Sequence, residues 1–110
     1  MKNKTEREES TVFGRRLRQA RKWAGLPQDR LGVAIGLDET TSSARISRYE
    51  TGVHEPPIAT ARLLALELGV PLAFLYCDDD ELAAALLNLA GMSATERRRL
   101  LRQLDWRMPE

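Results

Sequence analysis

This sequence has few of the residues that form disulfides, bind metals or serve in catalysis. It contains one cysteine and one histidine, and aromatic residues make up 5% of its 110 residues. One cysteine cannot form an intramolecular disulfide, so nothing indicates a disulfide-stabilised secreted fold, and Cys77 is expected to be a small buried apolar residue. The chain has no phosphate-binding loop, no Ser-His-Asp set and no cluster of metal ligands, so we expect neither an enzyme nor a cofactor or metal site.

Long apolar segments are also missing. No run approaches the roughly 20 apolar residues that a transmembrane helix needs. The first ten residues, MKNKTEREES, are polar and do not resemble a signal peptide. We therefore expect a cytoplasmic bacterial protein, associated with the nucleoid if it binds DNA. Residues 1–10 show no periodicity and are predicted to be a flexible tail.

What the sequence does contain favours helices. Hydrophobic residues make up 43% of the chain, and leucine and alanine dominate them, which favours packed helices over a sheet. Residues 1–62 hold 12 Lys or Arg against 8 Asp or Glu, whereas residues 63–110 hold 5 against 8. A basic first half and an acidic second half are consistent with a nucleic-acid face backed by a different surface.

The first predicted helix follows the tail. Phe13, Leu17, Ala20 and Ala24 fall on one stripe of a helix that begins after Ser10 or Thr11 and ends at Gly25. Basic residues surround this stripe: Arg15, Arg16, Arg18, Arg21 and Lys22. Two interpretations stay open for them, a solvated basic face and contact with phosphates for some of them.

Residues 26–52 are predicted to form two short helices joined by a turn. The first helix covers residues 28–35 and stops at Gly36, and the second runs from Ser42 or Ser43 to Glu50, before Gly52. A glycine inside a helix costs about 1 kcal/mol relative to alanine, so Gly32 indicates that two helices cross closely there. Such a pair is typical of the helix-turn-helix unit, whose second helix enters the major groove of DNA.

The second helix of this pair carries the candidate base contacts. Ile46 and Tyr49 are expected to face inward, which leaves Ser43, Ala44, Ser47 and Arg48 facing outward. Arginine can bridge O6 and N7 of guanine, and serine can bond to several bases. His54 lies in the following loop and is expected either to face solvent or to contact a phosphate.

The remaining helices divide the chain into two parts. Residues 58–68 are expected to be largely core through Leu63, Leu64, Leu66 and Leu68, and a short helix at 71–76 completes a domain over residues 11–77. Residues 78–110 then carry two amphipathic helices. Asp78, Asp79 and Asp80 stand at the start of the first, where capping and the helix dipole explain them better than Mg²⁺ does.

The last helix opens with a predicted capping box, Ser93 to Glu96. Its apolar side holds Leu100, Leu101 and Leu104, and opposite lie Arg97, Arg98, Arg99 and Arg102. The two helices can fold back on the core, form a homodimer contact or bind a different protein.

The segment FGRRLRQARKWAGLPQDRLGVAIGL, followed by ARISRYETGVHEPP, resembles the Cro/CI-type (XRE, lambda-repressor-like) helix-turn-helix family of bacterial and phage transcription regulators. The resemblance covers about residues 12–76. It implies an all-α fold: a five-helix lambda-repressor-like DNA-binding domain, here followed by two C-terminal amphipathic helices. It also implies a homodimer on double-stranded DNA with a roughly palindromic operator.

The resemblance also implies roles for single residues. Gln28 matches a residue that contacts a phosphate and braces the recognition helix, and Ser43, Ala44 and Arg48 match base-reading positions. Arg21 and Glu50 match a pair that form an ion pair between the first and third helices. The complete set of expected DNA contacts is Arg21, Gln28, Thr41, Ser42, Ser43, Ala44, Arg45, Ser47, Arg48 and His54.

Two departures from the family pattern affect this set. Pro27 stands where the family has threonine or serine, and the link between Gly36 and Ile46 is about four residues longer than usual. The extra residues can lengthen the turn or extend the recognition helix, which is why Thr41 and Ser42 join the expected contacts.

Two functions follow from these features. The first is a sequence-specific transcriptional regulator, expected to be a repressor. The second is an antitoxin that binds a partner protein through its C-terminal helices and autoregulates its operon. The sequence alone does not identify the operator or the regulated genes.

Overall fold

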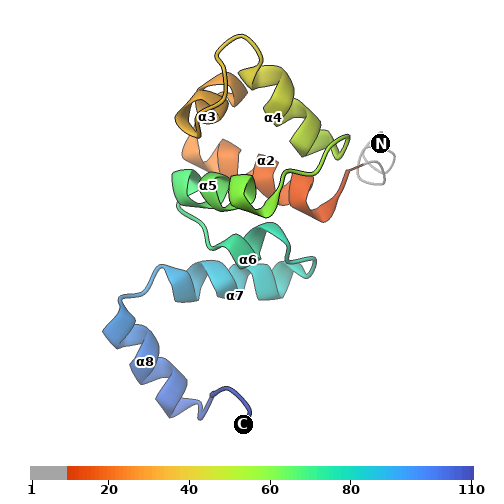
Figure 1. The fold of residues 1–110 in the computed structure, drawn as a ribbon. Coiled ribbons are helices and arrows are strands. Elements are labelled where there is room, and N and C mark those ends of the chain that lie inside the picture. Colours follow the sequence, from red (N-terminus) through yellow and green to blue (C-terminus); the bar gives the residue numbers. More distant parts are fainter. Residues whose placement is uncertain (1–9) are drawn as a thin grey trace.

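The structure is a computed structural model that describes residues 10–110, and all the regular elements of these residues are helices (Figure 1). The predicted tail, apart from Ser10, lies outside the described residues. The helices in chain order are α2 (Val12–Ala24), α3 (Gln28–Ala34), α4 (Ser42–Thr51), α5 (Ile58–Leu68), α6 (Leu72–Leu75), α7 (Asp80–Ala90) and α8 (Ala94–Gln103).

Helix α2 runs through the middle of the N-terminal domain and contacts α4, α5 and α6. The Thr11 hydroxyl accepts the Gly14 N–H at 2.9 Å and caps the start, and Gly25 ends the helix in the left-handed conformation (φ 69°). Phe13, Leu17 and Ala20 are buried as the stripe predicted. Ala24, the fourth member, is exposed because the helix ends there.

The core is completed from each neighbouring helix. Leu31, Ile46, Leu64, Phe74 and Leu75 have 0–1% of their surface exposed. Burying a side chain of this size stabilises the fold by about 1.5–3 kcal/mol. These residues come from α3, α4, α5 and α6, so a single core holds the helix pair against α2.

The prediction that α5 is largely core was wrong for two of its leucines. Leu64 is fully buried and Leu68 is half-buried, but Leu63 and Leu66 are 47% and 77% exposed. The helix is apolar around most of its circumference, whereas only the side that faces α2 and α6 is covered in one chain.

Helix α7 folds back onto the domain. Asp79 caps it by accepting the Leu82 N–H at 2.8 Å, and Ala83 is 2% exposed against the core.

Arg16 of α2 holds the junction between the N-terminal domain and α7. Its guanidinium donates to the Cys77 and Asp78 carbonyls and to the Asp80 carboxylate at 2.8–3.2 Å. Arg16 is 3% exposed and its guanidinium carbon lies 5.4 Å from the Phe74 ring centroid, so it is neither solvated nor a phosphate contact.

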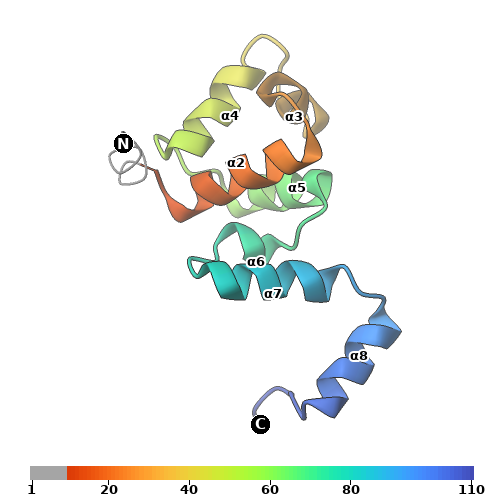
Figure 2. The same ribbon diagram turned by 180° about the vertical axis from the view of Figure 1, so that it is seen from behind.

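Helix α8 leaves the body of the molecule at an angle to α7, as both ribbon views show (Figure 2). The predicted capping box is present: Ser93 Oγ accepts the Glu96 N–H, and Glu96 accepts the Ser93 N–H. Hydrogen bonds to the Glu96 carboxylate, first from the Ser93 backbone and second from the Ser93 side chain, hold the pKa of Glu96 below its ordinary value. None of the residues in α8 is buried.

In the described residues, every helix is too short or too polar to cross a lipid bilayer.

Candidate nucleic-acid interface

The pair α3 and α4 crosses at close range over Gly32. A Cβ added there would overlap Ser42 Oγ and come within 2.9 Å of Ser42 Cβ. The prediction that Gly32 permits a close crossing is therefore confirmed. Helix α3 ends at Ala34, and the chain turns away at Gly36 (φ 96°), where the Leu37 N–H donates to the Gly32 carbonyl at 2.9 Å.

Ser42 is the residue that fills this crossing. It is 0% exposed, and its hydroxyl donates to the Asp29 carbonyl at 2.6 Å. The expectation that Ser42 contacts DNA is corrected, because its side chain points at α3 and has no path to a ligand outside. Its role is to lock the start of α4 onto α3.

The extra residues between the two helices lengthen the turn and leave α4 starting at Ser42. Asp38 organises this turn, since its carboxylate accepts the Thr40 N–H at 2.8 Å and the Thr40 hydroxyl at 2.6 Å. These bonds, the hydroxyl one first, lower the pKa of Asp38. Thr41 is exposed at the N-cap of α4, and its side chain makes no capping hydrogen bond.

A network of polar side chains fixes α4 to its two neighbours. Arg21 Nε and Nη2 donate to the Glu50 carboxylate at 2.5 and 3.2 Å, and Arg21 Nη1 donates to the Leu26 carbonyl at 3.0 Å. The ion pair that the resemblance implied is thus present, with Arg21 13% and Glu50 4% exposed. All three guanidinium nitrogens of Arg21 are engaged inside the protein, so we withdraw Arg21 from the expected DNA contacts.

Gln28 extends the same network from the start of α3. Its Nε2 donates to Glu50 Oε1 at 3.1 Å, and its Oε1 accepts the Ser43 hydroxyl at 3.3 Å. One amide therefore contacts α4 near both ends, which is the bracing geometry that the resemblance implied. Gln28 is only half-buried, so its side chain also reaches the surface.

Sequence reasoning missed what holds the end of α4. A Cβ at Gly14 would overlap the Glu50 carbonyl oxygen and lie 2.8 Å from that of Tyr49, so α2 and α4 touch backbone to backbone. The Ser10 hydroxyl also donates to the Glu50 carbonyl at 3.1 Å. Gly14 lies inside a helix as Gly32 does, and the same signal was available for it.

The outward face of α4 is polar and open to solvent. Ile46 and Tyr49 are buried as predicted, at 0% and 5% exposure. Ala44, Arg48 and Thr51 form the centre of the opposite face at i, i+4 and i+7, and all three are exposed. Thr51 was missed because the helix was expected to stop at Glu50.

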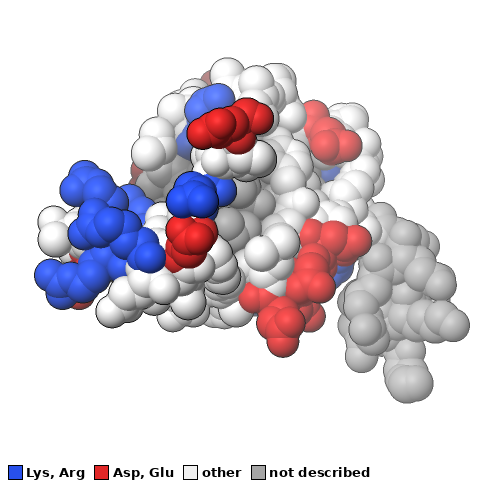
Figure 3. All heavy atoms as spheres, turned by 90° about the horizontal axis from the view of Figure 1, so that it is seen from below, with Lys and Arg blue, Asp and Glu red and all other residues white. Residues whose placement is uncertain are grey.

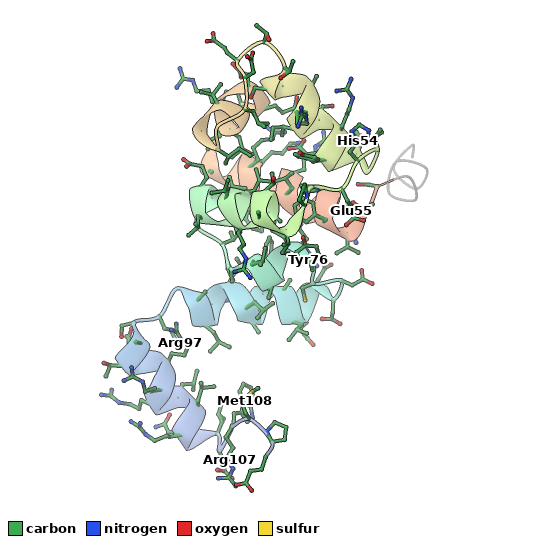
Figure 4. The ribbon with its side chains drawn as sticks, viewed as in Figure 1. His54, Glu55, Tyr76, Arg97, Arg107 and Met108 are labelled. Atoms are coloured by element: carbon green, nitrogen blue, oxygen red, sulfur yellow. The ribbon has the colours of Figure 1, made fainter. Side chains whose placement is uncertain are left out.

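The other expected contacts lie around this centre. Ser43 and Arg45 are exposed on its two sides, and Ser47 is half-buried. His54 is exposed in the loop after α4 (Figure 4), and its backbone N–H donates to the Arg48 carbonyl at 3.2 Å. The structure therefore brings Thr41, Ser43, Ala44, Arg45, Ser47, Arg48 and His54 to one helix and its two flanking turns.

The arginines of α8 lie elsewhere. The molecule seen from below has a group of Lys and Arg at the α8 end and a group of Asp and Glu where α7 starts (Figure 3). Helix α4 is at the opposite end of the molecule from α8 (Figure 1). Among residues 10–110, no three His, Cys, Asp or Glu residues gather into a possible metal site.

The comparisons with known proteins fit this geometry. A family model described as helix-turn-helix matches residues 17–75, which is more than half of the chain. The crystal structure of the transcriptional regulator BswR is similar, with 40% sequence identity and a TM-score of 0.80. That match covers 84% of this chain and 91% of BswR, so it extends beyond residue 77 into the C-terminal helices. Among curated proteins, no relative matched.

These matches confirm both the resemblance and the all-α fold. They also agree with the expectation of a protein that is not an enzyme, because the family consists of transcriptional regulators. The chain belongs to the XRE (Cro/CI-type) helix-turn-helix family and is a DNA-binding transcriptional regulator.

Proposed function

We propose that this protein is a repressor that binds a roughly palindromic operator as a homodimer, with α4 of each protomer in the major groove. The observation that carries the proposal is the contrast between the two sides of α4. Its inner side is fixed by Ser42, Glu50 and the core, and its outer side presents exposed polar residues. A helix held in this way can keep its side chains in register with base edges.

The residues of this face have separate roles in the proposal. Arg48, at the centre, reads a guanine, and Ala44 packs against a neighbouring base, for which a thymine methyl is the apolar partner. Ser43 and Ser47 bond to base edges beside them. Thr41, Arg45 and His54 contact phosphates on either side, and Gln28 adds a phosphate contact to its bracing role.

The first turn of α4 supports a phosphate contact as well. No acidic residue lies in this turn and no side chain caps its N–H groups. Free amide groups at a helix start favour an anion. In a homodimer the two half-sites would lie about one helical turn, roughly 34 Å, apart on the duplex.

Selection of bound duplexes from a random DNA library tests the proposal. We expect an enriched, roughly palindromic motif, with an affinity that falls steeply as the salt concentration rises. Transcription from a promoter that overlaps this motif should fall when the protein is added. A selection without an enriched motif, or a rise in transcription, would contradict the proposal.

The substitution Arg48→Ala tests the base contact. It should weaken binding to the selected motif by about 1–3 kcal/mol and relax one base position. Arg102→Ala is the matched control, because Arg102 is also exposed but lies on α8. A uniform loss over all duplexes would instead make Arg48 a phosphate contact.

A second candidate function is the antitoxin, in which α8 binds a different protein. One observation favours it: no residue of α8 is buried in the single chain. Copurification of a stoichiometric small protein from the native host would support this function, and a homodimer alone would count against it.

A further inference from the structure

Helix α8 and the segment after it leave a continuous apolar side uncovered. Leu104, Trp106 and Met108 are 46%, 60% and 86% exposed, and Leu100 and Leu101 are half-buried. The chain turns after α8 at Asp105 (φ 56°), and the Trp106 N–H donates to the Leu101 carbonyl at 2.9 Å. This hydrogen bond ties the start of the tail to α8, and Met108 lies in the tail beyond it (Figure 4). Clustered apolar residues of this kind mark an interaction surface.

Helix α7 has a second apolar side that continues this surface. Its inner side packs on the domain through Ala83. Leu82 and Leu89, seven residues apart, lie on the other side, where Leu82 is 57% exposed and Leu89 is half-buried. Leu86 lies between the two sides and also packs against the core. A helix that is apolar on two sides needs two partners, and the single chain supplies one.

The angle between α7 and α8 is fixed by a hydrogen-bonded arginine. Arg97 Nη1 donates to the Leu89 carbonyl at 2.9 Å and to the Met92 carbonyl at 3.3 Å. Arg97 lies at the corner between the two helices (Figure 4). Arg97 therefore braces the corner between α7, which carries Leu82, and α8, which carries Leu104, so that one partner can contact both helices.

The charges around this surface indicate what covers it. Asp78, Asp79 and Glu81 are exposed where α7 starts, and Arg98, Arg99 and Arg102 are exposed on α8, beyond the other end of α7 (Figure 3). Helix α7 has 11 residues, so its ends lie about 16 Å apart. Within one chain these two groups cannot pair with each other, although Asp78 contacts Arg15 and Asp79 caps α7. Two chains with antiparallel α7 helices would bring each acidic group to the partner's arginines, twice in one interface.

The duplex bound by α4 is not a suitable occupant. Helix α8 lies at the end of the molecule away from α4 (Figure 1). A nucleic acid would also cover arginines and leave Leu82, Leu104 and Trp106 exposed.

We propose that the outer side of α7, together with α8 and the tail to Met108, is the docking surface for a second copy of this chain. The two copies are related by a twofold axis, their α7 helices are antiparallel, and the apolar stripes meet at the centre. This inference rests on the homodimer of the proposed function and assigns its interface.

The molar mass of the full chain in solution, by light scattering or sedimentation, tests the interface without DNA. We expect a dimer for the unchanged chain. Leu82→Glu and Leu104→Glu should each raise the dissociation constant about 30-fold or more, because each puts a charge into the apolar centre. Leu66→Glu is the matched control: Leu66 is an exposed leucine, at 77%, on α5 outside the surface. Circular dichroism checks that each variant stays folded.

A charge exchange tests the antiparallel arrangement. Arg98 precedes Leu101 by three residues on α8, and Glu81 is next to Leu82 at the start of α7, so each charge borders the apolar surface. Glu81→Arg and Arg98→Glu should each weaken the dimer about 3-fold or more, and the double variant should recover most of the loss.

Three results would overturn the proposal. A chain that stays monomeric would assign the surface to a different protein, while binding to a selected duplex would still support DNA recognition. A dimer broken by Leu66→Glu but not by Leu82→Glu would place the interface on α5. A double charge variant weaker than either single variant would exclude the antiparallel pairing. In contrast, a dimer with no DNA motif would contradict the proposed function alone.

Discussion

The two ends of this molecule differ in how far the contacts within one chain bury and hydrogen-bond their side chains. In the helix-turn-helix end, α4 has a core on one side and a hydrogen-bonded network that reaches α2 and α3. In the described residues, no buried side-chain nitrogen or oxygen lacks a hydrogen-bond partner. At the other end, α8 is capped and braced at its start, yet no residue of it is buried.

This difference indicates that the two ends have different functions, DNA recognition at one end and partner binding at the other. DNA recognition needs side chains held at fixed positions, and the buried contacts of α4 supply that rigidity within one chain. The apolar surface of α7 and α8 is complete only with a partner. The same contrast appears in the ion pairs: the side chains of Arg21 and Glu50 are 13% and 4% exposed, and those of Arg107 and Asp105 are 79% and 77%.

The substitution Glu50→Ala should have the largest effect. It leaves the Arg21 guanidinium without its carboxylate and removes the acceptor of Gln28. Breaking a buried ion pair in this way lowers the free energy of unfolding by about 3 kcal/mol. Unfolding in urea, followed by circular dichroism, measures this loss.

Asp105→Asn is the matched control at the other end of the molecule. It removes an ion pair whose two side chains are mostly exposed, and asparagine tolerates the positive φ of this position. We expect no measurable change in the free energy of unfolding. Equal losses for Glu50→Ala and Asp105→Asn would refute the difference between the two ends.

The substitution Arg16→Ala tests the junction between the two ends. It removes the donor of four hydrogen bonds and leaves the Cys77 carbonyl buried without a partner, at a cost of about 2 kcal/mol. Hydrogen exchange should show faster opening at the start of α7. Arg15→Ala is the control, because Arg15 makes one exposed contact of 3.4 Å with Asp78, and its effect should be small.

The pH dependence of α8 should be the smallest effect. The pKa of Glu96 lies below its ordinary value of 4.5 because the ionised carboxylate accepts the Ser93 N–H. The stability from this bond is present above 4.5 and is lost as the pH falls through the lowered pKa. NMR titration should show α8 fraying from its start at low pH. The start of α2, capped by the Thr11 hydroxyl, should keep its hydrogen bond, and a simultaneous loss at both starts would contradict this explanation.

Much of the helix-turn-helix end could be predicted from the sequence because its signals are local or specific to the family. Gly25, Gly36 and Gly52 end their helices, and Gly32 marks the close crossing. The pairing of Arg21 with Glu50 needed the family resemblance, since the two residues are far apart in the chain.

Other features depend on packing that no local pattern records. Ser42 lies four residues before the buried Ile46 and on the same face of α4, but its side could not be assigned while the start of the helix was open between Ser42 and Ser43. Arg16 and Arg15 are adjacent arginines, yet the position of α7 buries only the first. Leu66 has the apolar pattern of a core residue, but the side of α5 on which it lies is uncovered.

The backbone amide NMR spectrum of the full chain, recorded with and without a selected operator duplex, tests whether α4 is the DNA-binding face. We expect the largest shifts on Thr41 to Arg48 and on His54, and little shift for the arginines of α8 at matched salt. Shifts centred on Arg98 to Arg102, with α4 unchanged, would contradict this expectation and move the DNA-binding face to the other end of the molecule.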